Sequence, residues 1–162
     1  FNIYQTGKKL IGISGEVTLP GVTSLTDSLE GAGVGGNLDL PVIGLVDSME
    51  MEIPFMSLIK DIFTLMDPTE TPDLTLNGAI QRTDPGTGKP GYLSLSIAVR
   101  GICKEFTPGN VKAGAKMESS VKLELLYYKI ILDGKTMLEI DKLNNVYIVN
   151  GHDVIAEVRN MC

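Results

Sequence analysis

A two-residue turn between apolar segments is the feature that most constrains what this chain can fold into. Asp133-Gly134 favours the positive backbone φ angles of a tight hairpin turn, and apolar strands flank it over residues 121–132 and 137–143. Glycine is frequent, at 18 residues, and gathers between segments with strand-like patterns. This arrangement favours a mainly β domain built from antiparallel hairpins.

Further segments alternate apolar and polar residues with the period of two that is typical of strands. In residues 46–53, Met49 and Met51 fall on one face while Glu50 and Glu52 fall on the other, which predicts a strand with one covered and one wet face. The other predicted strands are residues 74–83, 92–102, 146–149 and 154–158. The loop DPGTGKPG joins the first two of these as a hairpin.

One segment, residues 54–67, has a helical period instead. Its apolar stripe recurs at helical spacing and consists of Phe55, Leu58, Ile59, Ile62, Phe63 and Met66. Pro54 suits the first turn of a helix, and Pro68 ends the helix behind Asp67. The pattern predicts a single strong helix that packs against the flank of the sheet.

Two segments, residues 27–41 and 104–118, have no stable period and are predicted to be long loops. Gly31, Gly33 and Gly36 lie in the first loop, and Lys112 and Lys116 lie in the second. Loops of this length are uncommon in a compact domain unless they serve a function. They are therefore the candidate contact segments of the chain.

Length and composition bound the class of protein. The 162 residues, 43% of them apolar, fit one domain spanning residues 1–162 with a single core. No apolar run approaches the roughly 20 residues that span a bilayer, so no membrane segment is expected. The net charge of −6 argues against a nucleic-acid binder held by phosphate contacts. Two cysteines are too few for a disulfide framework.

The residues that could carry chemistry do not form a convincing site. Residues 31–36, GAGVGG, fit the dinucleotide pattern G-x-G-x-x-G, but the helix that should follow to hold a pyrophosphate is missing. Gly88-Lys89 resembles a P-loop fragment, yet Pro90 stands where a hydroxyl residue should bind the metal. His152 is the only histidine, and Cys103 lies in an apolar strand where a buried thiol is expected. We therefore expect no catalytic residue, cofactor or metal.

One alternative function remains open at this point. A monomeric or small-oligomer β-sandwich could bind a ligand or carbohydrate through its long loops. The absence of tryptophan and the aromatic content of 6% weaken this reading, because sugars stack on aromatic rings.

Three segments resemble the major tail tube proteins of contractile-tailed bacteriophages and phage-tail-like bacteriocins. Residues 78–84, GAIQRTD, are similar to the G-x-x-Q-R-x-D element of that family, and residues 99–105, VRGICKE, to its R-G-x-x-K-E element. Residues 132–151 carry the D-G-K, L-E-I-D and V-N-G elements of its C-terminal signature. The colinear order of these motifs extends the resemblance over roughly residues 14–160.

The resemblance implies a β-sandwich or barrel-like subunit with one flanking helix and no enzymatic activity. Six such subunits form a ring, and rings stack into a hollow tube through which DNA (phage) or ions (bacteriocin) pass. The implied partners are further copies of the chain, the sheath, baseplate and tail terminator proteins, and a tape measure protein in the lumen. The implied location is the virion tail, assembled in the cytoplasm of a bacterial host.

A tube also gives roles to particular residues. Pairing sheets from neighbouring copies would remove the unpaired strand edges that are a liability in a monomer. The two long loops, with Gly31, Gly33 and Gly36 in one and Lys112 and Lys116 in the other, become candidate contacts between subunits. Glu50, Glu52 and Glu124 become candidates for a lumen-facing surface, where carboxylates would repel the phosphates of passing DNA.

Overall fold

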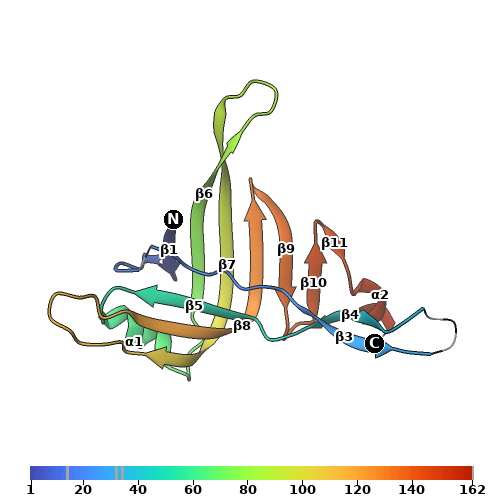
Figure 1. The fold of residues 1–162 in the computed structure, drawn as a ribbon, viewed down its shortest axis with the longest axis horizontal. Helices are drawn as coiled ribbons and strands as arrows, with labels where there is room; N and C mark the ends of the chain where they lie inside the picture. Colours follow the sequence, from blue (N-terminus) through green and yellow to red (C-terminus); the bar gives the residue numbers. More distant parts are fainter. Residues whose placement is uncertain (14, 32, 34, 162) are drawn as a thin grey trace.

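The computed structural model describes residues 1–13, 15–31, 33 and 35–161, which form mostly antiparallel β structure. The order along the chain is β1 (Asn2–Gln5), β2 (Lys8–Lys9), β3 (Ser24–Leu29), β4 (Leu38–Val46), β5 (Glu50–Phe55), α1 (Lys60–Met66), β6 (Asp73–Thr83), β7 (Pro90–Thr107), β8 (Ser119–Leu132), β9 (Lys135–Asp141), β10 (Val146–Val149), β11 (His152–Asp153) and α2 (Ala156–Met161). The mainly β prediction is confirmed (Figure 1).

Most strands pair with their neighbours in the chain. The main sheet has the order β11-β10-β9-β8-β7-β6-β1-β2, and β5 pairs with β8 off this path. The predicted turn between β8 and β9 is confirmed, because Asp133 and Gly134 have φ angles of 51° and 79° as a tight hairpin requires. The predicted hairpin between β6 and β7 is also present, and its tip projects from the body of the molecule (Figure 1).

The sheet folds over along the two longest strands, β7 and β8. The first half of β8, residues 119–124, pairs with β5, whereas residues 127–132 pair with β9. Register shifts in β7 at Arg100/Gly101 and at Cys103/Glu105 mark where that strand bends, as bulges do. The resulting two layers resemble a sandwich open on one side, and the described residues do not close into a barrel.

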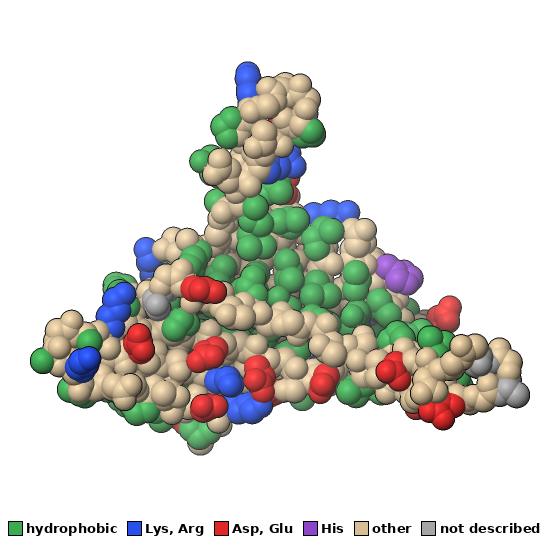
Figure 2. Space-filling model, in the orientation of Figure 1, with side chains coloured by type: hydrophobic (Ala, Val, Ile, Leu, Met, Phe, Trp, Pro, Cys, Tyr) green, Lys and Arg blue, Asp and Glu red, His purple; other side chains and the backbone are tan. Residues whose placement is uncertain are grey.

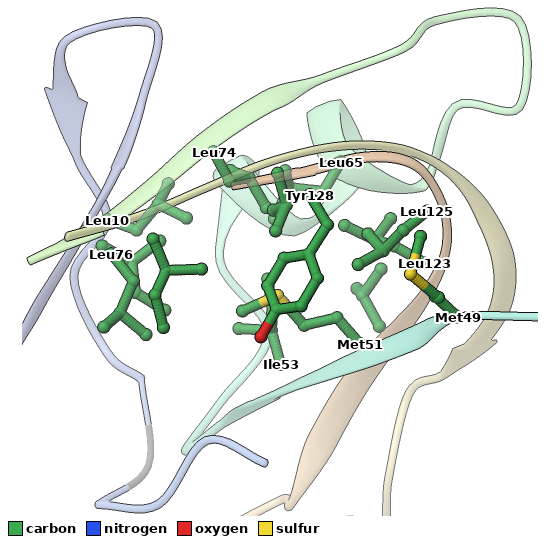
Figure 3. Packing of buried hydrophobic residues seen from close by; sticks show 14 of the residues in the cluster. Leu10, Met49, Met51, Ile53, Leu65, Leu74, Leu76, Leu123, Leu125 and Tyr128 are labelled. Carbon is green, nitrogen blue, oxygen red and sulfur yellow. The ribbon is translucent and has the colours of Figure 1, made fainter. Parts of the chain in front are cut away.

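The core lies between these layers. Met51, Ile53 and Phe55 of β5 are fully buried, and Met51 lies beside its strand partner Leu123 of β8 (Figure 3). Tyr128 of β8, Leu74 and Leu76 of β6, and Leu65 of α1 complete the same cluster. The alternation of Met51 and Ile53 with Glu50 and Glu52 therefore sets the inner and outer faces of β5 as predicted.

The predicted helix at residues 54–67 was too long at its start. Pro54 and Phe55 belong to β5, where they pair with Ser120 and Ser119, so α1 begins only at Lys60. Its buried face consists of Ile62 and Leu65, while Phe63 of the predicted stripe is 53% exposed. These two residues belong to a strand because their pairing with β8 satisfies backbone hydrogen-bonding groups that would otherwise have to be satisfied within a helix.

Three further predictions need correction. Residues 27–41 are not one loop, because β3 and β4 pair there as a hairpin. The second loop is shorter than residues 104–118, since β7 continues to Thr107 and the loop spans residues 108–118. A second helix, α2, replaces most of the strand expected at residues 154–158, so the helix count of one was wrong. Residues 46–53 also divide between β4 and β5.

Candidate assembly surfaces

The three predicted carboxylates lie together on the outer face of the β5–β8 layer. Glu50 and Glu52 are exposed, and they alternate with the fully buried Met51 and Ile53. Glu124 pairs directly with Glu50 across the two strands and is half-buried. The predicted outward orientation of Glu50 and Glu52 is therefore confirmed.

Basic side chains lie among these carboxylates. Lys104 Nζ forms an ion pair with Glu50 and lies 3.7 Å from Glu124 Oε2. The Ser48 hydroxyl lies 2.7 Å from Glu124 Oε2 and donates a hydrogen bond to that carboxylate. The hydrogen bond that Lys104 donates to Glu50 lowers the pKa of Glu50 and raises the pKa of Lys104. This surface is thus partly neutralised within one subunit.

The hairpin of β3 and β4, which we call the arm, extends from the body of the molecule (Figure 1). Gly31, Gly33 and Gly36 lie at its tip with φ angles of 146°, 95° and 145°, which only glycine adopts readily. The nucleotide-like pattern at residues 31–36 falls partly outside the described residues, at Ala32 and Val34. The three glycines serve the turn that reverses the arm.

The end of the arm near its tip has one apolar face, and nearer the base Ile43 and Leu45 are also exposed. Leu29 pairs with Leu38, and Asp27 pairs with Leu40. Because side chains alternate along a strand, the face that holds Asp27 also holds Leu29, Leu38 and Leu40, whereas the register shift between Ser24 and Thr26 interrupts the alternation at Leu25 and Val42. All five apolar side chains are exposed. This face was not predicted because residues 27–41 were expected to form a loop. The alternation of apolar residues in residues 25–29 and 38–42 indicates the two strands.

Lys112 and Lys116 lie in the loop at residues 108–118, at the opposite end of the molecule from the arm tip (Figure 1). The loop is held at its base, where Asn110 N–H donates to Met117 O at 2.9 Å and Met117 N–H donates to Met56 O at 3.1 Å. Both lysines are exposed. One subunit therefore does not bring the two predicted contact segments together.

The outer face of the β6–β9 part of the sheet carries a polar network that the sequence analysis missed. Arg100 Nε donates to Asp73 Oδ1 at 2.6 Å across β7 and β6, which raises the pKa of Arg100. The Arg100 guanidinium also lies 5.9 Å from the centre of the Tyr127 ring. Lys129 and Glu139 face each other between β8 and β9 at 3.8 Å. The pairing of these charges depends on strand register, which single-strand patterns do not reveal.

The residues considered for chemistry lie apart from one another. Cys103 is half-buried on β7, its thiol donates weakly to Glu105 O, and burial raises its pKa. His152 is exposed on β11, and Gly88 and Lys89 lie at the tip of the β6–β7 hairpin. Among the described residues, no three His, Cys, Asp or Glu side chains gather closely enough to hold a metal ion. No helix in the described part of the chain has the length and apolarity to cross a bilayer.

Comparison with known proteins gives the family. The family model described as phage tail tube protein FII matches residues 1–161. The tail tube protein of Escherichia phage P2 is 29% identical over 98% of this chain and 91% of its own length. The major tail tube protein of Serratia phage KSP20 is 27% identical over 97% of this chain and 89% of its own length. These are structural components of virion tails rather than enzymes, and with a match over nearly its full length this chain belongs to the phage tail tube protein FII family.

Proposed function

We propose that this subunit forms six-membered rings that stack into the hollow inner tube of a contractile tail, through which phage DNA passes. The observation that carries the proposal is the family match from residue 1 to residue 161. The open sandwich supports it, because the edge strands β2 and β11 are two residues long and the sheet stops there without closing. Copies that join such sheets side by side remove exposed edges.

Symmetry explains how one subunit can make both a ring and a tube. A head-to-tail contact within the ring closes by rotation, whereas a head-to-tail contact between rings does not close and grows a filament. The arm and the loop at residues 108–118 lie at opposite ends of the molecule (Figure 1), which suits contacts with two different neighbours. We therefore assign Gly31, Gly33 and Gly36 to one contact, and Lys112 and Lys116 to another.

The tube contacts other tail proteins in this proposal. Its outer surface meets the sheath protein, its ends meet the baseplate and the tail terminator, and its lumen holds a tape measure protein before DNA enters. Assembly takes place in the cytoplasm of the bacterial host. The names of the two phage relatives support a DNA-conducting tail over a headless bacteriocin.

Negative-stain electron microscopy of the purified protein tests the assembly directly. Rings and tubes of uniform width are expected as the protein concentration rises, because stacking is an open-ended association. Sedimentation velocity on the same samples should show a ring species of six copies. A strictly monomeric protein at high concentration would contradict the proposal.

The lumen assignment of Glu50, Glu52 and Glu124 needs a separate test. These carboxylates are exposed and gathered on one surface, but Lys104 offsets part of their charge. Single substitutions Glu52→Cys and Ser94→Cys place a thiol on the outer faces of the β5–β8 layer and of the β6–β9 sheet, respectively. In intact tubes a bulky maleimide should spare the cysteine that lines the lumen and label it after tubes are dissociated. If Glu52→Cys is labelled as fast in tubes as in free subunits, the assignment is wrong.

A further inference from the structure

The upper part of the β6–β9 sheet has an apolar face that the rest of the described chain covers only in part, since Leu95, Ile130 and Leu138 border the core cluster. Strand register places six residues on the core side of the sheet beyond the reach of β5: Ile80, Leu93, Leu95, Ile130, Leu132 and Leu138. They are half-buried or exposed, although they continue the rows of the fully buried Leu74, Ile97 and Ile140. We call these six residues the open sheet face. Figure 2 shows hydrophobic side chains gathered in this region of the molecule.

The dimensions of the open sheet face fit another apolar element. The segment before the arm crosses its lower part, where Val17 and Leu19 line an open depression of about 240 Å³ together with Leu76 and Leu95. Four neighbouring strands span about 14 Å at the usual strand spacing, and a six-residue strand such as β3 is about 20 Å long. A two-stranded hairpin therefore has the dimensions to cover what remains.

The arm of the same chain has the complementary surface but cannot reach this face. A two-stranded hairpin is marginally stable by itself and needs a partner for its apolar side. The arm extends along the lower edge of the molecule, away from the projecting β6–β7 hairpin (Figure 1). Its base is fixed there, because Gly44 packs so closely on Ile155 that a Cβ atom at Gly44 would lie 2.3 Å from Ile155 Cγ2. Only a second copy can bring the two apolar faces together.

The charges on the two faces match as well. Asp27 is the single ionisable residue among the alternating positions of the apolar arm face. Two basic residues border the open sheet face: Lys135, which pairs with Leu132 of β8, and Arg82, which occupies the same side of β6 as Ile80. Arg82 is the partner that we consider for Asp27. Both side chains are exposed, and neither forms an ion pair within the described residues. Opposite charges on the two apolar faces favour one direction of docking.

We propose that the apolar arm face of one subunit docks on the open sheet face of a neighbouring subunit, with Asp27 paired to Arg82. This inference rests on the proposed tube and names the contact that builds it. The contact is heterologous, since it joins different surfaces of identical chains, and it makes arm ordering a part of assembly.

A charge exchange between two variants tests this contact. Asp27→Arg alone places Arg opposite Arg82, and Arg82→Asp alone places Asp opposite Asp27, so each variant should lose at least about tenfold of its assembled fraction. An equal mixture should assemble, because every arm then meets a face of opposite charge if the two variants alternate. The double variant D27R/R82D should assemble by itself. Pelleting assays and electron microscopy measure the assembled fraction.

The matched control is Asp39→Arg, which makes the same charge change on the opposite face of the arm beside Ser28. It should assemble like the wild type. Circular dichroism and thermal unfolding of the free subunits establish that all variants fold, as expected for exposed positions. If Asp27→Arg assembles normally, or if the mixture fails while the variants are folded, the contact is wrong although tubes still form. A wild-type protein that stays monomeric would instead overturn the proposed function.

Discussion

At the scale of single residues, a few positions set the bend on which the two layers depend. Gly101 lies at the register shift of β7, and a Cβ atom there would be 2.8 Å from the carbonyl oxygen of Glu124 on β8. Lys104, three residues further along β7, forms ion pairs with Glu50 of β5 and with Glu124 of β8. The bend is therefore held by a close backbone approach on one side and by charge pairs on the other.

Substitution of Gly101 by alanine should destabilise the subunit by about 1–3 kcal/mol, because the added methyl group forces the backbone of β7 and β8 apart. Gly91→Ala is the matched control on the same strand, since a Cβ atom there has no neighbour within 4 Å. Denaturant unfolding of both variants measures the difference. Equal free energies of unfolding for the two variants would show that the approach at Gly101 is not constrained.

The Lys104–Glu50 pair should make stability depend on pH. Because the hydrogen bond from Lys104 lowers the pKa of Glu50 from its ordinary value of 4.5, the pair stabilises the fold above that value and is lost as the pH falls through the folded pKa. Glu50→Gln should therefore lose less stability than the wild type between about pH 6 and pH 3. Thermal unfolding of free subunits across this range, with Glu52→Gln as the control, provides the measurement. Parallel curves for wild type and Glu50→Gln would rule the effect out.

At the scale of elements, the period of two was a reliable guide and the period of 3.6 was not. Strands such as β6 and β8 lie close to where alternation predicts them, and Asp133-Gly134 correctly marks the turn between β8 and β9. The helix was misplaced because Phe55 and Ile59 fit a helical stripe by spacing, whereas Phe55 pairs with Ser119 in the sheet. Partners distant in the chain decided that competition, and a local pattern contains no information about them.

The helix register itself can be tested with two substitutions. Leu65→Ala should cost about 2–5 kcal/mol of unfolding free energy, since Leu65 is fully buried under the β7–β8 layer. Phe63→Ala should cost about 1 kcal/mol, because its ring is half exposed and packs mainly against Phe106 at 5.9 Å. Urea unfolding distinguishes them, and a larger loss for Phe63→Ala would restore the stripe that the sequence predicts.

Of the candidate surfaces, the sequence predicted the outer face with Glu50 and Glu52 but neither the arm nor the open sheet face. Alternation alone placed Glu50 and Glu52 on an outer face, as the structure confirms. The arm was missed because the glycines at its tip and the acidic residues along it masked the pairing of Leu29 with Leu38. The open sheet face could not be read from the sequence, since its residues look like an ordinary core until the extent of the covering layer is known.

At the scale of the whole molecule, three segments project from the body of the subunit. The arm extends from one end, the loop with Lys112 and Lys116 from the other, and the β6–β7 hairpin projects between them (Figure 1). Such a shape leaves much apolar surface in water for a monomer, including Leu25, Leu40 and Ile43 of the arm. Exposed apolar surface on this scale marks an interaction site.

Assembly should therefore protect the arm from proteolysis. No lysine or arginine lies between Lys9 and Lys60, so trypsin cannot cut within the arm. A glutamate-specific protease can cut there, at Glu30. Free subunits should be cleaved there rapidly and assembled tubes slowly, and mass spectrometry of the fragments identifies the site. The Glu30→Gln variant removes the cleavage site as a control. Equally fast cleavage in tubes and free subunits would mean that neighbours leave the arm exposed.

The strand order of the sheet also shapes how the chain folds as it is synthesised. From β6 to β11 every strand pairs with its neighbour in the chain, and such local contacts form quickly once the C-terminal half emerges. Among the described strands of the N-terminal half, only β1–β2 and β3–β4 pair locally, since β1 also pairs with β6 and β5 pairs with β8. On the ribosome, β5 therefore has no partner among the described strands until β8, in the second half of the chain, has been made. The carboxylates spaced through residues 16–52, with no basic residue among them, give this segment a uniform negative charge that opposes aggregation with other nascent chains.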